Sequence, residues 1–415
     1  MQNTASGSFA NLNENVNYLD EPDYAMLIRT VDLSNKMSKQ PIFIDEHAYN
    51  FLSNSNLFGG EIILSNIGSV GNVFMYEPMY ERASLAPNSI MIRMLENNRY
   101  YYYWFLNPIV NETLKIIGSD SVQAKFNKTQ LRQFCVAHPS ESEQQKIADY
   151  LDEKTAQIDS IIDNTKQSIA EFKKYKQALI TETVTKGLNP DVKMKDSGIE
   201  WIGEIPEHWG ITKLKYLLNK EKDSLKVGPF GSSLKSGDYV EDGYWVYNQR
   251  TVLDSNFETN DTFISKEKYH ELINFKIEEE DILITTRGSI GKVSRVPKEF
   301  NEGVLHPCII KFKIDSNKVV YEVLEKVFNY SDFVSKQLKL LSNSTTIDVI
   351  YSYTLKNIAY PMIPIKEQQQ IADYLDEKCA HIDNLIADKE KLIGEFETYK
   401  KALIFEYVTG KKEVD

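Results

Sequence analysis

The sequence predicts an α+β protein: two mixed α/β globular parts separated by two long antiparallel helices that form a coiled-coil spacer. The phrase EQQKIADYLDEK (143–154) returns as EQQQIADYLDEK (367–378), a separation of 224 positions (367 − 143). After each copy, apolar residues recur at the three- and four-residue spacing of an amphipathic helix. Before each copy, short β-type runs alternate with turns, which is typical of a mixed α/β domain. We therefore expect an internal repeat with pseudo-twofold symmetry.

The repeat extends well beyond this phrase. Downstream, IAEFKKYKQALI (169–180) corresponds to IGEFETYKKALI (393–404) at the same offset. Upstream, GEIILSNIGSVGNV (60–73) corresponds to EDILITTRGSIGKV (280–293), with the offset shortened to 220 (280 − 60). Nothing near the N-terminus corresponds to residues 200–227. The first globular part is thus expected to be N-terminally short relative to the second.

These matches divide the chain into five predicted segments. They are a first globular part (1–142), a first spacer helix (143–188), a linker (189–199), a second globular part (200–366) and a second spacer helix (367–412).

Composition restricts the class of protein. A chain of 415 residues with 42% hydrophobic residues is globular and too long for one ordinary core. The longest apolar run, YYYYWFL (100–106), is far shorter than the roughly 20 residues that cross a bilayer, and no basic-then-apolar leader opens the chain. Three scattered cysteines fit reduced thiols better than a disulfide framework or a zinc site. We expect a cytoplasmic protein without membrane contact or metal.

The formal charge of −12 argues against indiscriminate binding to nucleic acid, because phosphate contacts need Lys and Arg. It does not exclude a local basic surface.

The two tails are predicted to pair along an apolar seam whose positions step by four and three. The seam residues are Ile147, Leu151, Ile158, Ile161, Phe172 and Leu179 in the first tail and Ile371, Leu375, Ile382, Leu385, Phe396 and Leu403 in the second, with Tyr175, Leu392 and Tyr399 continuing it. Ser142 and Gln145 are expected to form a capping box at the start of the first helix. The alternative is that each stripe packs on its own domain. Helices of roughly 40 residues, about 60 Å long, favour pairing with each other, and the intervening domain allows them to run antiparallel.

Neither copy carries a recognisable catalytic motif. The stretch VGPFGSSLKS (227–236) lacks the GxxxxGK[ST] pattern of a phosphate loop, and no Ser/His/Asp or Cys/His set occurs in both copies. Acidic residues beside the seam, such as Asp149 and Asp152, are better explained as helix surface. A duplicated catalytic unit should show its residues twice, so we predict no catalytic residue, metal or cofactor in this chain.

The feature that does recur is Gly-Ser-[Val/Ile]-Gly after an apolar strand, at 68–71 and 288–291. Glycines there permit positive φ, and successive N–H groups can hold an anion such as phosphate; an ordinary tight turn is the alternative. The neighbouring polar residues differ between copies, as expected of two recognition surfaces. Candidate DNA-binding residues, suited to phosphates or base edges, are Arg29, Ser69, Lys235, Asn248, Gln249, Arg250, Thr286, Arg287 and Ser289.

The repeated EQQ-x-IADYLDEK with its long helix resembles the conserved regions of the specificity subunit of type I restriction–modification systems. The segment DSGIEWIGEIPEHWGITKLKYL (196–217) resembles that family's lead-in to a target recognition domain. The resemblance implies a non-catalytic subunit whose two target recognition domains each read half of a split double-stranded DNA sequence. It further implies that the paired helices dock two methyltransferase subunits, which bind S-adenosylmethionine, and that restriction subunits join the complex.

The chain departs from this family in lacking a lead-in before the first domain. Three explanations stay open: a missing opening strand, a misplaced start codon, or completion of the domain by the C-terminal end of the chain.

A scaffold with two protein-binding ends and no DNA is the alternative function. Half-sites about one helical turn apart, roughly 34 Å, are compatible with helices of the predicted length.

Overall fold

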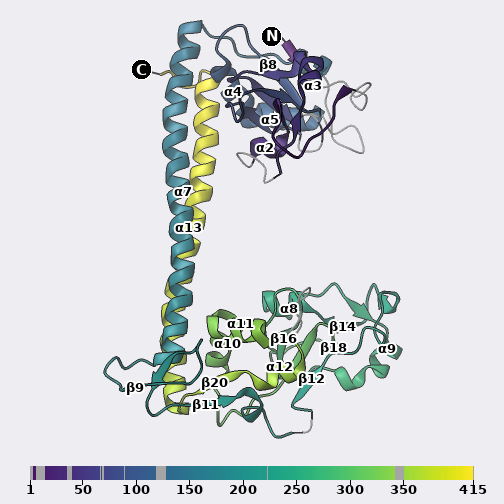
Figure 1. Cartoon of the computed structure of the whole chain (residues 1–415), viewed down its shortest axis with the longest axis vertical. Coiled ribbons are helices and arrows are strands. Elements are labelled where there is room, and N and C mark those ends of the chain that lie inside the picture. Colours follow the sequence, from purple (N-terminus) through teal and green to yellow (C-terminus); the bar gives the residue numbers. More distant parts are fainter. Residues whose placement is uncertain are drawn as a thin grey trace. The chain divides into compact units, whose positions relative to one another are not determined.

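Figure 1 shows the computed structural model of the chain, which describes residues 3–5, 15–34, 40–65, 67, 70–87, 89–117, 128–221, 223–341 and 350–414. The chain forms two compact units. Unit 1 comprises Met1–Gln167 and Lys389–Asp415, and unit 2 comprises Ser168–Asp388. The candidate residue Ser69 lies outside the described residues.

Unit 2 contains two four-stranded sheets. The first is antiparallel in the order β12 (Leu225–Val227), β19 (Ile309–Phe312), β16 (Ile282–Thr285), β17 (Val293–Arg295). The second has the order β13 (Tyr239–Val240), β15 (Phe263–Ile264), β14 (Tyr244–Tyr247), β18 (Gly303–Leu305), with β14 and β18 parallel. The central strand β16 is buried on both faces: Ile282 and Ile284 enter one hydrophobic cluster and Leu283 enters another.

Unit 1 repeats this design. One sheet has the order β1 (Asn3–Ala5), β8 (Ser89–Arg93), β5 (Ile62–Ser65), β6 (Val73–Met75), and the other β3 (Phe43–Ile44), β2 (Ala25–Ile28), β7 (Ala83–Leu85), β4 (Asn56–Leu57). β1 pairs with β8 as β12 pairs with β19, so an edge strand is present at this position in both units.

Helices flank the sheets in the same chain order in both units. In unit 1 these are α2 (Thr30–Ser34), α3 (Glu46–Phe51), α4 (Asn98–Leu106), α5 (Pro108–Ile117) and α6 (Lys128–Arg132). In unit 2 they are α8 (Gln249–Asp254), α9 (Lys266–Glu271), α10 (Tyr321–Tyr330), α11 (Asp332–Leu341) and α12 (Ser352–Asn357). Short 3₁₀ turns occur at η2 (Ser53–Ser55), η3 (Leu214–Tyr216), η4 (Ser236–Asp238) and η5 (Ile273–Phe275).

A buried carboxylate recurs at the start of the central strand in each unit. Asp281 is 1% exposed and accepts a hydrogen bond from Lys311 Nζ at 2.7 Å and from the Glu278 N–H at 2.8 Å. Its counterpart 220 positions earlier, Glu61, is 2% exposed and accepts from Arg93 at 2.9 Å and from two backbone N–H groups. A buried charge needs such partners, so both domains surround this carboxylate with backbone N–H groups and a basic side chain, although the basic residues occupy different positions of the neighbouring strand.

Two long helices, α7 (Glu141–Lys186) and α13 (Ile365–Val408), lie side by side and antiparallel (Figure 1). In unit 1, Leu151 and Ile158 of α7 share a hydrophobic cluster with Leu403 and Val408 of α13. In unit 2, the C-terminal part of α7 packs in a cluster with the N-terminal part of α13, including Leu375. The predicted fold class, two mixed α/β domains with long antiparallel helices, is confirmed.

Two ion pairs show the symmetry of this helix pair. Asp159 accepts a hydrogen bond from Lys400 Nζ at 2.7 Å in unit 1, and Asp383 accepts one from Lys176 Nζ at 2.7 Å in unit 2. Asp383 lies 224 positions after Asp159, and Lys400 lies 224 positions after Lys176. The same contact is therefore made once in each unit, with the roles of the two helices exchanged.

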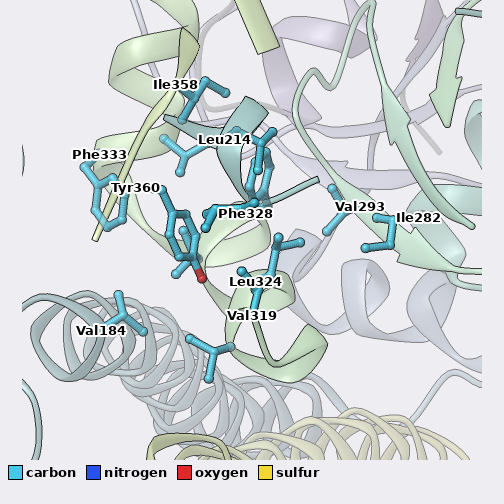
Figure 2. Close-up of a cluster of buried hydrophobic side chains, with 14 of the residues drawn as sticks. Val184, Leu214, Ile282, Val293, Val319, Leu324, Phe328, Phe333, Ile358 and Tyr360 are labelled. Carbon is cyan, nitrogen blue, oxygen red and sulfur yellow. The ribbon is translucent and has the colours of Figure 1, made fainter. Parts of the chain in front are cut away.

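The seam residues of these helices also pack on the domains. In unit 2, Val184 of α7 shares one core with Leu214, Phe328 and Tyr360 of the globular part (Figure 2). Unit 1 has the equivalent arrangement, because Leu151 lies in one cluster with Tyr100 and Trp104 of α4. Pairing and packing on the domain, treated as alternatives above, thus occur together.

The predicted seam residues fall into three groups by burial. Leu151, Ile158, Ile371, Leu375, Ile382 and Leu403 are buried, Ile147, Phe172, Leu179, Leu385 and Phe396 are half-buried, and Ile161 is 41% exposed. Tyr175 and Tyr399 are also exposed, at 57% and 56%.

The placement of Ile161, Tyr175, Leu392 and Tyr399 on the seam was wrong, because all four are exposed. The buried stripe of α7 instead passes through residues eleven apart, Ile158, Ile169 and Ile180. An eleven-residue spacing matches the roughly 3.6-residue turn of a nearly straight helix, whereas a strict seven-residue repeat drifts away from it. The stripe therefore moves one position along the chain relative to the heptad prediction.

The predicted capping box at Ser142 and Gln145 was also wrong. Ser140 directly precedes the first helical residue, and its N–H donates to Glu143 Oε2 at 3.0 Å, while the Glu143 N–H donates to Ser140 Oγ at 3.4 Å. The reciprocal contact of a capping box is made two residues earlier than predicted.

Replacing Leu375 by Asp tests the helix pairing. Leu375 is fully buried in a hydrophobic cluster, so the change removes apolar contacts and places a charge among apolar side chains. We expect the free energy of unfolding to fall by at least the roughly 2–5 kcal/mol of a buried Leu truncation, measured by urea denaturation. The matched control is Leu392→Asp on the same helix, where Leu392 is 39% exposed; equal losses for the two variants would contradict the observed seam.

Candidate nucleic-acid interface

The loop after β16 is shaped by two glycines in the left-handed region, Gly288 (φ 65°) and Gly291 (φ 80°). The Thr285 hydroxyl donates to the Ser289 carbonyl at 2.5 Å and closes the turn. A Cβ on Gly288 would lie 3.2 Å from the side-chain nitrogen of Gln249, so the loop lies directly against the start of α8. Arg287 and Ser289 are exposed on this loop.

A second loop reaches the same place from the end of β12. The Gly228 N–H donates to the Ile309 carbonyl at 2.9 Å, and a Cβ on Gly228 would lie 2.2 Å from the His306 carbonyl oxygen. The Thr286 N–H donates to the Cys308 carbonyl at 3.0 Å. The turn at 306–309 thus joins the two loops, and only glycine allows the close approach at position 228.

We define the unit 2 tip as residues 228–230, 249–250, 286–289 and 350–353. The last segment belongs to it because the Ile350 N–H donates to the Thr286 carbonyl at 3.0 Å.

Two of the predicted DNA-binding residues stabilise the local structure of this region. Asn248 is the N-cap of α8 and accepts from the Arg250 N–H at 2.9 Å. Thr286 is 4% exposed, and its hydroxyl donates to the Cys308 carbonyl at 2.9 Å. These two residues are positioned to hold the tip loops, while Gln249, half-buried beside Gly288, and the exposed Ser289 stay available at the surface.

The basic candidate residues differ in their exposure and in the ion pairs that they make. The Arg250 side chain is 78% exposed, with ion-pair distances of 3.5 Å to Asp254 and 3.6 Å to Asp261, longer than a good hydrogen bond. Lys235 is exposed just before η4, outside the tip as defined. Arg287 is exposed. Burial lowers the pKa of His306, and the nearby charge of Arg287 lowers it further, which favours the neutral imidazole.

The counterpart region of unit 1 is organised differently. Arg29 donates through two of its nitrogens to Asp32, each at 3.0 Å, and to the Gln40 carbonyl at 2.7 Å. Asp32 is fully buried, and its hydrogen bond with Arg29 raises the arginine pKa. Arg29 therefore neutralises an internal carboxylate.

Ile67 occupies the position that Arg287 has in unit 2, so the two domains present different chemistry at equivalent loops.

Three exposed aromatic residues of the tip were not among the sequence candidates. Phe230 is 84% exposed, Tyr353 76% and Tyr351 65%. An aromatic side chain in the Gly- and Ser-rich stretch GPFGSS (228–233) is the sequence signal that could have identified Phe230. Exposed aromatic groups beside Arg can insert between base steps or pack on sugars and bases.

In the part of the chain that the structure describes, no helix is long and apolar enough to cross a membrane. Within the same residues, no group of three or more His, Cys, Asp or Glu side chains is placed to hold a metal ion.

Comparison with known proteins places this geometry in a family. The family model described as the type I restriction modification DNA specificity domain matches residues 8–172 and again residues 206–393. The chain belongs to this family and carries two of its DNA specificity domains, which makes it a specificity subunit that reads a bipartite DNA target.

Individual relatives agree with the family model. A protein of Methanocaldococcus jannaschii, assigned as the specificity subunit of the type I restriction enzyme MjaX, is 26% identical over 90% of this chain and 83% of its own length. The specificity subunit of the type I restriction enzyme EcoBI from Escherichia coli is 25% identical over 70% of this chain and 60% of its own length.

A solved structure shows the same fold. It comes from work described as the structural basis of complex assembly and conformational transition of the type I R-M system. With a TM-score of 0.65 and 13% identity, it covers 85% of this chain and 82% of its own.

Replacing Arg287 and Arg29 by Ala should give opposite phenotypes. Loss of the exposed Arg287 should weaken DNA binding by about 1–3 kcal/mol and leave the free energy of unfolding unchanged. Loss of Arg29 leaves Asp32 buried without its cation, so the free energy of unfolding should fall by about 1–3 kcal/mol. Fluorescence anisotropy with labelled duplex and urea denaturation measure the two effects; normal DNA affinity for Arg287→Ala at every salt concentration would remove it from the interface.

Proposed function

We propose that the unit 2 tip makes the DNA contacts of the second recognition domain. The observation that carries this proposal is that Arg287, Arg250 and Phe230 are exposed on, or at the edge of, loops that converge on one turn. The guanidinium groups suit guanine edges or phosphates, and Gln249 suits adenine. Ser289 and Lys235 extend the polar surface on either side. Unit 1 uses a less basic set, which is consistent with the two domains reading different half-sites.

We further propose that α7 and α13 dock two identical methyltransferase subunits, with restriction subunits joining the assembly. Support comes from Tyr175 and Tyr399, which are 57% and 56% exposed and occupy equivalent positions 224 residues apart. One lies in each unit. Exposed tyrosines are frequent binding hot spots, and a pair related by the repeat offers the same surface to two copies of one partner.

On this proposal the chain contributes recognition and no chemistry. The partner methyltransferase subunits bind S-adenosylmethionine and methylate adenine, and the restriction subunits cleave DNA. The charge of −12 fits such a division, because the partners would supply much of the phosphate neutralisation that this chain lacks.

Replacing Tyr175 or Tyr399 by Glu tests the docking surface. Each single variant should bind one methyltransferase subunit in place of two, and the double variant none, because a carboxylate is costly to bury in an apolar contact. Native mass spectrometry gives the stoichiometry. Tyr216→Glu is the control, since Tyr216 is 60% exposed and lies outside both helices. Two bound subunits in the double variant would place the docking surface elsewhere.

The charge argument is tested by measuring DNA affinity over a salt series, with and without the methyltransferase. We expect weak binding by the chain alone and a steeper dependence of log affinity on log salt for the complex, because more phosphates are neutralised. Equal affinities and equal slopes would show that this chain makes the phosphate contacts itself.

A further inference from the structure

In unit 2, residues 189–217, which contain the lead-in (196–217), cover a seat formed by the edge strand β20 (Ala359–Met362) and the ends of the two long helices. β9 (Met194–Asp196) and β10 (Glu204–Pro206) form a hairpin, and β11 (Gly210–Lys213) then pairs antiparallel with β20.

A tryptophan anchors this segment. Trp209 is 1% exposed, and its Nε1 donates to Glu367 Oε2 at 3.0 Å, while His208 Nε2 lies 2.7 Å from Glu367 Oε1. The indole ring packs against the end of α7, because a Cβ on Gly187 would lie 3.2 Å from it. The seat is therefore filled by a strand with a tryptophan immediately before it.

In the part of unit 1 that the structure describes, the same seat has no such strand. Moving back 224 positions, β20 corresponds to residues 135–138 and Glu367 corresponds to Glu143. Among the described residues, no strand pairs with 135–138. Cys135 and Ala137 are exposed, whereas their equivalents in unit 2, Ala359 and Pro361, are half-buried and buried.

Two tyrosines of α4 contact the segment 135–138. Tyr100 Oη donates to the Ala137 carbonyl at 3.3 Å, and Tyr101 Oη lies 2.7 Å from His138 Nδ1. Beside this edge is a hollow of about 540 Å³. It is lined by Glu143, Ile147 and Val408 and also by residues 409, 410 and 412–414, which follow α13. The equivalent hollow of unit 2 is smaller, at about 290 Å³. It is lined by Glu367 and Ile371, the counterparts of Glu143 and Ile147, and by parts of the lead-in.

We propose that the edge at 135–138 in unit 1 binds an extended polypeptide segment of the lead-in type, a strand directly preceded by a tryptophan. An open strand edge is a template for antiparallel pairing, and unit 2 shows which kind of segment the seat accepts. Such a segment completes unit 1 as residues 204–213 complete unit 2. This inference is independent of the DNA contacts proposed above.

The repeat also gives the register of the bound segment. In unit 2, Lys213 lies opposite Ala359 and Thr212 lies opposite Tyr360. By equivalence, the residue at the Lys213 position lies opposite Cys135, which is an exposed free thiol. Residues directly opposite in an antiparallel pair have Cα atoms about 4.5–5.5 Å apart, within the range that a disulfide spans.

The experiment uses the full chain and a synthetic peptide of residues 199–217 carrying Lys213→Cys, activated as a mixed disulfide with thionitrobenzoate. The Cys135 thiolate attacks the peptide sulfur, a Cys135–peptide disulfide forms, and thionitrobenzoate leaves with the electron pair and is measured by its absorbance. We expect this peptide to react on the order of tenfold faster, or more, than one carrying Thr212→Cys, whose thiol points to the opposite face. Adding Trp209→Ala to the reactive peptide should slow its reaction to the rate of the Thr212→Cys peptide.

Two protein variants control the assignment. Cys135→Ser should remove the fast reaction, because Cys308 is half-buried and Cys379 is buried. When Ala359→Cys is added to the Cys135→Ser variant, a thiol stands at the equivalent position of unit 2. The lead-in already occupies that edge, so the fast reaction should not return. Equal rates for the two cysteine peptides, or the same rate with Trp209→Ala, would overturn the proposal.

Discussion

The antiparallel contact between α7 and α13 is the interaction on which the rest of the molecule depends. Its buried residues enter the cores of both units, so the helices are part of each domain as well as partners of each other. The paired contacts Asp159–Lys400 and Lys176–Asp383 are the same interaction made twice. Because these pairs are partly exposed, they contribute little stability. Their value is in fixing the register that the apolar seam alone would leave less defined.

The two domains combine a common frame with different surfaces. The buried carboxylates Glu61 and Asp281 and the two sheets are shared, whereas the loop after the central strand carries Ile67 in one copy and Arg287 in the other. Arg29 and Arg250 show the same divergence, since one is held by a buried Asp and the other is exposed. A duplicated reader can change its DNA target at such positions without altering the frame.

The repeat, the fold class and most of the seam could be predicted from the sequence because they are periodic. The errors at Ile161 and Tyr175 arise from a heptad assumption that a nearly straight helix does not obey over this length. The structural role of Arg29 could not be predicted, because it depends on Asp32 being buried by residues far along the chain. Phe230 was missed since a lone aromatic residue in a loop has no period. The domain boundaries, the DNA-contact residues and the cofactor of the partner stay predictions.

The central claim is that one chain, paired along its own two helices, reads two separate DNA tracts with two unlike domains. Profiling methylated adenines in a host that carries the complete system tests it most directly, with the original chain and with Arg287→Ala. The account predicts a split motif of two specified tracts around an unspecified gap, and relaxation of one tract only in the variant. A single continuous motif, or loss of specificity in both tracts together, would contradict it.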